Sequence, residues 1–390
     1  MNPPLRILHL NSLLKGGGTD DRSVRIAHAL LAQGVAVWLA GPAGREFSAI
    51  AQQLGVPFQS TPIGPLKLPL IVSVARFIRA QRIQVIHARH GRDYWPAILA
   101  ARLSGARPKV VLSRHLAKSP ASWFSRRFLL GRCDAMLAVS HFVAKVLREG
   151  DADPGSSNPE RHCRPPMLAG FEKIHVVRGG FDMERFRPAE APARRAEWGL
   201  QPDHFAFAVV GGYDLPRGKG QPEFLSAAAR MRSRCPAARF LIIGRGNMRA
   251  QLEDQILDYA MSEVAKLTPY CHDMPGAMNA IDCLVLPQVG TEAIPGVVCE
   301  AHACGKPVIA TRLDGIPEAF DTAGYGELVV PESREPLADA MERWAARPPL
   351  GLPDRWELHR KVAAEFSLEQ AARQLAGFYR SLLSGPGRSA

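Results

Sequence analysis

Short apolar stretches recur along the chain, and segments with the three-to-four-residue spacing of amphipathic helices separate them. Short apolar strands that alternate with helices favour parallel sheets buried on both faces. The pattern therefore predicts an α/β fold with two similar halves in tandem. The predicted strands are LRILHL, VAVWLA, VIHA, KVVLS, AMLAVS and IHVV in the first half, and AFAVV, RFLIIG, KLTPY, CLVLP, PVIAT and ELVV in the second.

The length of 390 residues exceeds that of one ordinary domain. A segment rich in proline, alanine and charge predicts a linker, and the last residues have an amphipathic helical pattern. The predicted divisions are a first domain at residues 1–185, a linker at 186–203, a second domain at 204–365 and a terminal helix within 366–390. Residues 150–170 are polar, proline-rich and long for a helix-to-strand connection, which predicts a mobile loop or lid.

The formal net charge of +12 is concentrated in the first half, where residues 1–180 contain 25 Lys and Arg against 10 Asp and Glu. No apolar run reaches the roughly 18 residues of a membrane span. MNPPLRILHL reads as a first strand rather than a signal peptide, because it lacks a basic segment before a cleavage site. Seven cysteines without CxxC spacing fit a reducing compartment. We therefore expect a cytoplasmic protein.

Two basic stretches in the first half combine apolar and cationic residues, PLIVSVARFIRAQR at residues 69–82 and SPASWFSRRFLLGR at residues 119–132. Such stretches suit an anionic membrane surface or a phosphorylated acceptor. The alternative is a helix that faces the core and keeps a solvated basic side. Nucleic acid is not an expected partner, because no recognised nucleic-acid module appears.

The segment TEAIPGVVCEAHACGKPVIAT at residues 291–311 predicts a short helix at about 296–304. Pro295 suits its start, and Gly305 and Pro307 would end it before an apolar strand. The N–H groups around Gly296 and Val297 would then form an anion site suited to phosphate. Glu292 and Glu300 flank that site, and their oxygens can accept hydrogen bonds from sugar hydroxyls. The alternative is that both glutamates are solvated or cap the helix.

A second candidate anion site follows the predicted strand at residues 207–210. There a glycine-rich turn carries Arg217 and Lys219 and leads into a helix that begins near Gln221. Glycines allow close approach of the backbone, and the two cations match the charge of a diphosphate. A phosphate site flanked by hydroxyl-binding carboxylates describes a nucleotide sugar as substrate.

Other signals are weaker. Gly16, Gly17 and Gly18 follow the first strand without a G-x-G-x-x-G pattern or a ribose-binding acid, so a nicotinamide cofactor is not expected. The DxD sequence at residues 151–153 lies in a polar loop, and His87 and His90 lack partners at metal-site spacing. We expect no metal and no cofactor, with loop or acceptor-side roles for the two histidines.

The pairing of Lys219-Gly220 with the E-x7-E block from Glu292 to Glu300 resembles the family 4 retaining glycosyltransferases of GT-B fold. The likeness extends over nearly the whole chain. Segments 5–37, 176–188 and 280–287 look like that family's first strand with its glycine loop, its interdomain junction and the strand before its donor loop. One departure is that the Arg usually found several residues before the Lys is missing, and Arg217 lies only two before Lys219.

The resemblance implies two Rossmann-like domains whose parallel sheets face each other across a cleft, with the final helix crossing back to the first domain. It implies that Arg217 and Lys219 neutralise the departing diphosphate, while Gly17 and Gly18 approach it from the opposite domain. Glu300 would hold the ribose and Glu292 would orient the donor sugar.

His115 ends the sequence KVVLSRH, at the carboxyl edge of a predicted parallel strand, where open α/β sheets gather their ligands. A lone histidine in such a place can equally be structural. The resemblance implies that His115 hydrogen-bonds near the reacting end of the donor. Arg89, Arg92 and Arg114 are the acceptor-side candidates.

The predicted function is therefore a retaining, metal-independent glycosyltransferase that moves a sugar from a nucleotide diphosphate sugar to a glycan or lipid-linked acceptor. Synthesis of cell-surface polysaccharide or lipopolysaccharide is the expected setting, at the inner face of the cytoplasmic membrane. Two alternatives stay open at this point. One is a non-transferase enzyme of the same fold, such as a nucleotide-sugar epimerase, and the other is a catalytically silent nucleotide-sugar binding protein.

Overall fold

The computed structural model describes residues 4–14, 17–150, 164–215, 218–269 and 271–384. Two compact units divide this part of the chain. Unit 1 contains the described residues up to Gly150, those from Arg164 to Phe181 and those from Phe366 onward. Unit 2 is Asp182–Glu365.

Unit 1 contains a seven-stranded sheet, within the described residues, in the order β3-β2-β1-β4-β5-β6-β7. All of its strand pairs are parallel. The strands are β1 (Arg6–Leu10), β2 (Ala36–Gly41), β3 (Phe58–Ser60), β4 (Val85–Ala88), β5 (Lys109–Arg114), β6 (Ala135–Ala138) and β7 (Ile174–Val176). The helices are α1 (Gly18–Ala32), α2 (Glu46–Gln53), α3 (Leu68–Ala80), α4 (Tyr94–Leu103), α5 (Trp123–Phe128), α6 (His141–Glu149) and α15 (Leu368–Ser384).

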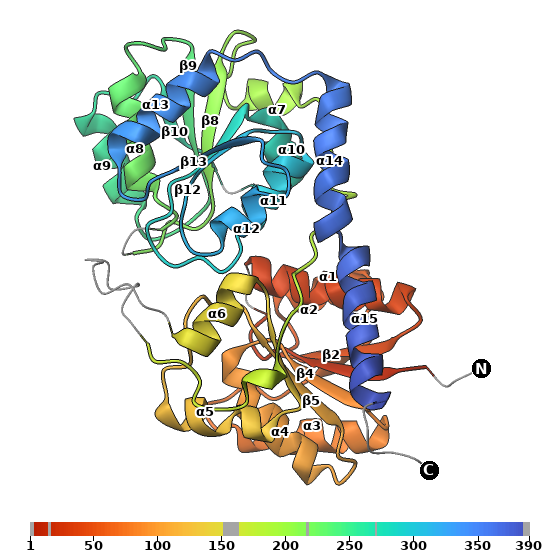
Figure 1. Ribbon diagram of the computed structural model, residues 1–390. Coiled ribbons are helices and arrows are strands. Elements are labelled where there is room, and N and C mark those ends of the chain that lie inside the picture. Colours follow the sequence, from red (N-terminus) through yellow and green to blue (C-terminus); the bar gives the residue numbers. More distant parts are fainter. Residues whose placement is uncertain (1–3, 15–16, 151–163, 216–217, 270, 385–390) are drawn as a thin grey trace. The chain divides into compact units, whose positions relative to one another are not determined.

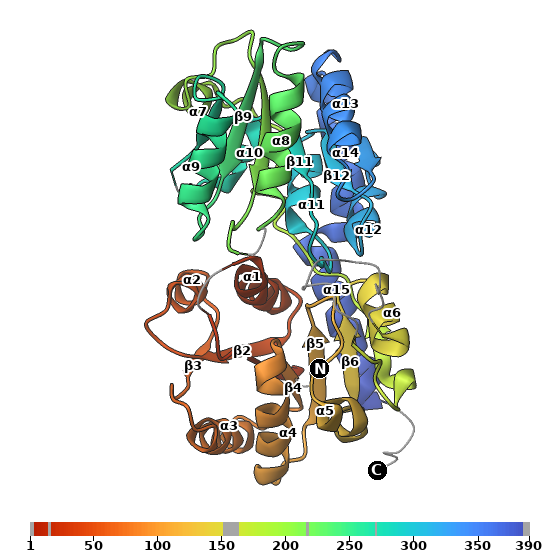
Figure 2. The ribbon, with the colours of Figure 1, turned by 90° about the vertical axis from the view of Figure 1, so that its left-hand side faces the viewer.

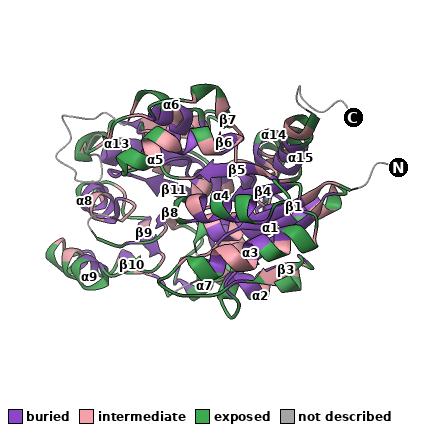
Figure 3. Cartoon of the chain, turned by 90° about the horizontal axis from the view of Figure 1, so that it is seen from below, coloured by how far each residue is buried: buried purple, intermediate pink, exposed green. Residues whose placement is uncertain are grey.

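Helices cover both faces of this sheet. α1 packs beside α15 on one face, where Ile7, Val37 and Val111 of the sheet join the same core, and α3 packs beside α4 (Figures 1 and 2). The strands are consequently buried on both sides, as Figure 3 shows for β4 and β5. This burial explains why the sequence shows continuous apolar strands rather than alternating ones.

Unit 2 contains a six-stranded parallel sheet, within the described residues, in the order β10-β9-β8-β11-β12-β13. The strands are β8 (Phe205–Val210), β9 (Ala238–Ile243), β10 (Ala265–Leu267), β11 (Cys283–Leu286), β12 (Val308–Thr311) and β13 (Gly326–Val329). The helices are α7 (Pro192–Glu197), α8 (Gln221–Met231), α9 (Arg249–Asp258), α10 (Met274–Ala280), α11 (Gly296–Ala303), α12 (Ile316–Phe320), α13 (Arg334–Ala345) and α14 (Leu352–Phe366).

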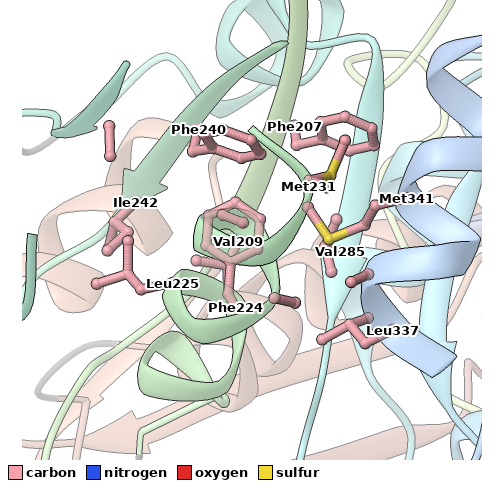
Figure 4. Packing of buried hydrophobic residues seen from close by; sticks show 14 of the residues in the cluster. Phe207, Val209, Phe224, Leu225, Met231, Phe240, Ile242, Val285, Leu337 and Met341 are labelled. Atoms are coloured by element: carbon pink, nitrogen blue, oxygen red, sulfur yellow. The ribbon is translucent and has the colours of Figure 1, made fainter. Parts of the chain in front are cut away.

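The core of unit 2 lies between its sheet and the neighbouring helices α8 and α13 (Figures 2 and 4). Phe207 of β8 stacks on Phe240 of β9 with ring centroids 6.0 Å apart, and Phe224 of α8 packs edge-on against Phe240. Full burial of one such side chain contributes roughly 1.5–3 kcal/mol. Leu337 and Met341 of α13 close the same cluster.

The two parallel sheets confirm the predicted α/β fold, and every predicted strand is present. β3 is the strand that the sequence pattern missed, because its three residues, Phe58–Ser60, are partly or fully exposed and form no apolar run. In the part of the chain that the structure describes, no helix has the length and apolar character needed to cross a bilayer.

α15 completes unit 1. Its first turn meets the chain at Phe181, whose N–H donates to the carbonyl of Phe366 at 2.7 Å, and the N–H of Leu368 donates back to the carbonyl of Phe181 at 3.1 Å. Gly180 permits this approach, since an added Cβ would lie 2.8 Å from the Cα of Leu368 and from the Cβ of Ala371. The helix therefore docks where only glycine fits.

A buried polar chain ties α15 to the sheet. Tyr379 Oη lies 3.0 Å from His9 Nε2 on β1 and 2.5 Å from His87 Nδ1 on β4, and His87 Nε2 lies 2.7 Å from Ser113 Oγ on β5. Burial, followed by the positive charge of Arg89, lowers the pKa of His9 and of His87 well below the usual value. Both rings are therefore neutral at pH 7. His87, expected from the sequence in a loop or on the acceptor side, is instead fully buried.

From this polar chain we expect that removing the hydroxyl group of Tyr379 lowers the free energy of unfolding by a measurable amount. Tyr379→Phe leaves His9 Nε2 and His87 Nδ1 without partners in a buried site, so the free energy of unfolding should fall by about 1–3 kcal/mol. Urea unfolding would measure the loss. Tyr259→Phe is the control, because among the described residues that hydroxyl accepts a single long hydrogen bond, from Gln255 at 3.5 Å. Equal stability of the two variants would contradict the expectation.

Candidate functional site

The glycine-rich turn after β8 is fixed at its end by a close backbone approach. Gly220 immediately precedes α8 with φ of +87°, and an added Cβ would lie 2.0 Å from the carbonyl oxygen of Pro287. The buried Gln221 accepts a hydrogen bond from the N–H of Lys219 at 2.7 Å. These constraints hold the backbone of Lys219 against the loop that follows β11. Arg217, predicted to lie in the same turn, falls outside the described residues.

Lys219 and Glu292 meet across that loop. Lys219 Nζ forms an ion pair with Glu292 Oε2, although the two residues are 73 positions apart in the sequence. Glu292 is oriented further by its own Oε1, which accepts from the N–H of Ala293 at 3.0 Å, and by Asp314, which accepts from the N–H of Glu292 at 3.2 Å. The structure thus brings together two of the residues that the sequence pattern singled out.

α11 begins directly after this loop, at Gly296, and ends at Ala303, close to the predicted bounds. Pro295 caps its start in an extended conformation, and Gly305 follows its end with φ of +73°. The first-turn N–H groups of a helix point outward without acceptors inside the helix, and they favour anions. Gly296 and Val297 belong to this turn, and Glu300 lies one turn further, half-buried.

The arrangement in unit 2 combines a cation, a helix N-terminus and two carboxylates. The side chains of Lys219 and Glu292 remain 33% and 13% exposed, so a ligand can reach them. An entering anion can take over Lys219 from Glu292, and the released carboxylate can accept hydrogen bonds from hydroxyl groups. This chemistry suits a phosphorylated, polyhydroxylated ligand.

His115 lies in unit 1, in the loop after β5. Its Nε2 is buried and has no hydrogen-bond partner among the residues that the structure describes. Burial, followed by the charges of Arg89 and Arg22, lowers the pKa of His115 well below the usual value, so the ring is neutral at pH 7. Gly17, with φ of +97°, and Gly18 form the start of α1 in the same unit.

The three arginines expected on the acceptor side have different surroundings. Arg89 is buried, and its Nε donates a long hydrogen bond to Ser23 Oγ at 3.4 Å. Arg114 is also buried, and its Nε donates to the carbonyl of Lys118 at 2.8 Å, which indicates a structural role. Arg92 is exposed and lines a cavity of about 190 Å³ together with Arg45 and Lys67.

The sequence did not single out three residues that lie beside the candidate residues, namely Asp314, Arg45 and Lys67. Asp314 follows β12. Ligands of parallel sheets bind near the carboxyl ends of the strands, so its position after a predicted strand is the signal that could have identified it. Arg45 and Lys67 lie in separate loops, and no sequence spacing predicts that they share a cavity with Arg92. Among the described residues no group of three or more His, Cys, Asp or Glu side chains could hold a metal ion. The DxD sequence at 151–153 falls outside the described residues.

Models of two protein families match the chain. Residues 16–155 match "Glycosyltransferase Family 4", and residues 204–347 match "Glycosyl transferases group 1". These two ranges contain His115 in one case and Lys219, Glu292 and Glu300 in the other.

The chain is also similar to individual proteins. It is 30% identical over 279 residues to α-D-kanosaminyltransferase of Streptomyces kanamyceticus, covering 69% of each chain. It is 31% identical over 236 residues to D-inositol 3-phosphate glycosyltransferase of Segniliparus rotundus, covering 57% of this chain and 50% of the relative. The chain thus spans about half the length of that relative.

A solved structure, that of HepE from Anabaena in complex with UDP and glucose, superposes with a TM-score of 0.74. The match covers 97% of this chain and all of HepE, at 20% sequence identity. This likeness shows the fold.

The turn at Gly220 can be tested apart from any ligand. Gly220→Ala should lower the free energy of unfolding by about 1–2 kcal/mol for the left-handed backbone, plus ~1–3 kcal/mol for the contact with Pro287. The matched control is Gly199→Ala, because Gly199 also has a positive φ but has open space at its Cβ position. Chemical denaturation of both variants would measure the difference, and losses of the same size would refute the role of the Pro287 contact.

Proposed function

Because the chain belongs to the family 4 glycosyltransferases, we propose that it transfers a sugar from a nucleotide diphosphate sugar to a glycan or lipid-linked acceptor, with retention of configuration at the anomeric carbon. The observation that carries this proposal is the contact of Lys219 with Glu292 beside the N-terminus of α11. A diphosphate needs cations and N–H donors, whereas the attached sugar and ribose need hydrogen-bond acceptors. Unit 2 offers both within one loop cluster.

The proposed chemistry is stabilisation of the leaving nucleotide. As the bond from the sugar to the diphosphate lengthens, negative charge develops on the phosphate oxygens and the sugar becomes oxocarbenium-like. Lys219 and the N–H groups of Gly296 and Val297 stabilise the diphosphate, since fixed donors aimed at developing charge lower the barrier. Arg217 is proposed to add a second cation. This set of donors supports catalysis without a metal ion.

The carboxylates and His115 have separate proposed roles. Glu300 binds the ribose hydroxyls, and Glu292 exchanges its ion pair with Lys219 for hydrogen bonds to the donor sugar. His115, neutral and with a free Nε2, hydrogen-bonds the sugar near the reacting carbon. Gly17 and Gly18 allow the start of α1 to approach the phosphates without side chains. The acceptor attacks on the face that the diphosphate leaves, and a phosphate oxygen takes the acceptor's proton, which accounts for retention.

The donor site predicts a selective loss of nucleotide affinity. Lys219→Met should weaken UDP binding by roughly tenfold to a hundredfold, the value of one hydrogen bond to a charged group. Isothermal titration with UDP, GDP and ADP would measure this and identify the base. Lys266→Met is the control, since Lys266 is an exposed lysine of β10 in the same unit. Unchanged affinity in Lys219→Met would remove that residue from the site.

Analysis of the reaction products separates the transferase from its alternatives. The proposal requires that a nucleotide sugar and an acceptor together yield a glycoside whose anomeric configuration, measured by NMR, matches that of the donor. Release of an altered free sugar without acceptor would instead identify an epimerase. Tight binding of nucleotide sugar without turnover across acceptors would identify a binding protein.

The acceptor is proposed to carry a phosphate group. Arg45, Lys67 and Arg92 converge on a cavity of about 190 Å³ in unit 1 that also has apolar walls, including Leu13 and Leu66. Cations beside apolar side chains suit a phosphorylated lipid or glycan. The Segniliparus relative is named for inositol 3-phosphate, a compound that also carries a phosphate group.

We propose that the protein binds peripherally to the inner face of the cytoplasmic membrane. The surface of α5 would make the contact. This helix leaves Trp123 and Phe124 59% and 50% exposed. Arg127 and Arg132 lie over the ring of Phe128, with centroid distances of 5.2 and 5.0 Å. Exposed aromatic rings flanked by arginines are typical of the interface between lipid and water.

The membrane proposal predicts flotation of the protein with vesicles that contain anionic lipid at low salt. Replacing Trp123 and Phe124 together by Ala should abolish flotation, whereas high salt should reduce it by screening the arginines. Leu257→Ala is the control, because Leu257 is a comparably exposed apolar residue of α9 in unit 2. Absence of flotation at low salt would reject the membrane surface as a partner.

A further inference from the structure

Arg89 is a buried cation without a counter-ion. Its side chain is only 7% exposed, and among the residues that the structure describes no carboxylate pairs with it. Within the described residues, the hydrogen bonding of its side chain is limited to the long contact from Nε to Ser23 Oγ at 3.4 Å. Burial lowers the pKa of Arg89 to about 10. Tyr379 acts in the opposite direction, and the charge of Arg22 lowers the pKa further. The guanidinium therefore stays charged at neutral pH. Buried charges are normally paired, because an unpaired charge loses its hydration without compensation.

The surroundings of Arg89 add positive charge rather than negative. Arg89 lines a cavity of about 30 Å³ with Arg22 of α1, Arg178 after β7 and His115. Arg22 is held by a hydrogen bond from its Nε to the carbonyl of Gly18 at 2.9 Å and by the face of Phe181, 5.0 Å from its guanidinium carbon. Arg178 lies over Phe366 at 5.6 Å. The arginines are thus positioned by backbone and aromatic contacts.

The walls of the cavity limit what can enter. Ala371 and Leu375 of α15 close it on one side, and Gly179 and Gly180 leave room beside the arginines. A cavity of about 30 Å³ holds only one or two water-sized groups, so the space admits a group of a few atoms rather than a whole sugar ring. Planar guanidinium groups match carboxylate and phosphoryl oxygens.

We propose that Arg22, Arg89 and His115 form an oxyanion site in unit 1 that receives a single carboxylate or phosphoryl substituent. The assignment of that substituent to a sugar substrate rests on the proposed transferase function, and it would make this enzyme selective for an acidic or phosphorylated sugar. Binding of a free anion does not rest on it. His115 Nε2, buried and unpartnered, supplies a hydrogen bond once an oxygen occupies the cavity.

The test is a titration of the full chain with inorganic phosphate, sodium glucuronate and glucose at constant ionic strength. The background variant is Lys219→Met, because the donor site in unit 2 also attracts anions. Arg89→Met added to this background should weaken anion binding at least about tenfold. The control adds Arg355→Met instead, a buried arginine that already has partners in Glu190, Asn279 and the carbonyls of Ala189 and Cys304. It should lose stability and keep the anion affinity.

Thermal unfolding without anion supplies a second readout. Arg89→Met removes an uncompensated buried charge, so its unfolding temperature should match or exceed that of the background, and it should no longer rise with added phosphate. If Arg89→Met does not fold, the half-exposed Arg22→Met replaces it, with anion affinity expected to fall about fivefold or more.

The outcomes separate the ligand classes and the two proposals. Stronger binding of phosphate than of glucuronate identifies a phosphoryl group, and the reverse order, with no binding of glucose, identifies a carboxylate. Anion affinity that is equal in the background and in the Arg89 and Arg22 variants overturns the oxyanion site. If those variants lose anion binding while the unmutated chain fails to bind any nucleoside diphosphate, the oxyanion site is retained and the transferase is rejected.

Discussion

The ion pair between Lys219 and Glu292 is the contact on which the candidate site of unit 2 depends. β8 and β11 are neighbours in the sheet and run parallel, so the loops that follow them leave at the same edge. Gly220 lets these two loops touch at Pro287, and the ion pair then fixes the side chains that each loop contributes. A partly exposed ion pair adds little stability. The ion pair instead positions a cation and a carboxylate together at the start of α11.

Unit 1 differs from unit 2 in how its buried cation is compensated. Its central cation, Arg89, has no acidic partner among the described residues. Burial, followed by the charge of Arg89, lowers the pKa of His9, His87 and His115 and keeps the three rings neutral. A neutral histidine can both donate and accept a hydrogen bond, which a protonated one cannot. Of the three, only His115 lines the cavity beside Arg89, and within the described residues its Nε2 has no hydrogen-bond partner. In unit 2 the compensating carboxylate belongs to the chain, whereas in unit 1 the proposed oxyanion of a ligand would compensate Arg89.

The architecture could be predicted from the sequence because buried parallel strands leave continuous apolar runs, as in Phe205–Val210 and Val308–Thr311. The start and end of α11 could be predicted because Pro295 and Gly305 have few other uses at those positions. The family is confirmed by the matching models and by the relative from Streptomyces kanamyceticus. The individual roles of His115, Glu292 and Glu300 stay predictions. The cavities were not predictable, since Arg22 of α1 and Arg89 after β4 are brought to one cavity only by the tertiary fold. The burial of His87 involves Tyr379, on a helix almost 300 residues later.

The chain leaves unit 1 at Phe181 and re-enters it at Phe366, and these two residues are joined by a hydrogen bond. Unit 1 is therefore discontinuous in sequence, although the residues where the chain leaves and re-enters it are neighbours in space. A fragment that stops before α15 would leave the apolar groove for Leu375 and Tyr379 open to water and would be prone to self-association. Joining residue 181 directly to residue 366 through a few glycines would instead give a single polypeptide for the isolated N-terminal half, suitable for screening ligands by NMR without the other half.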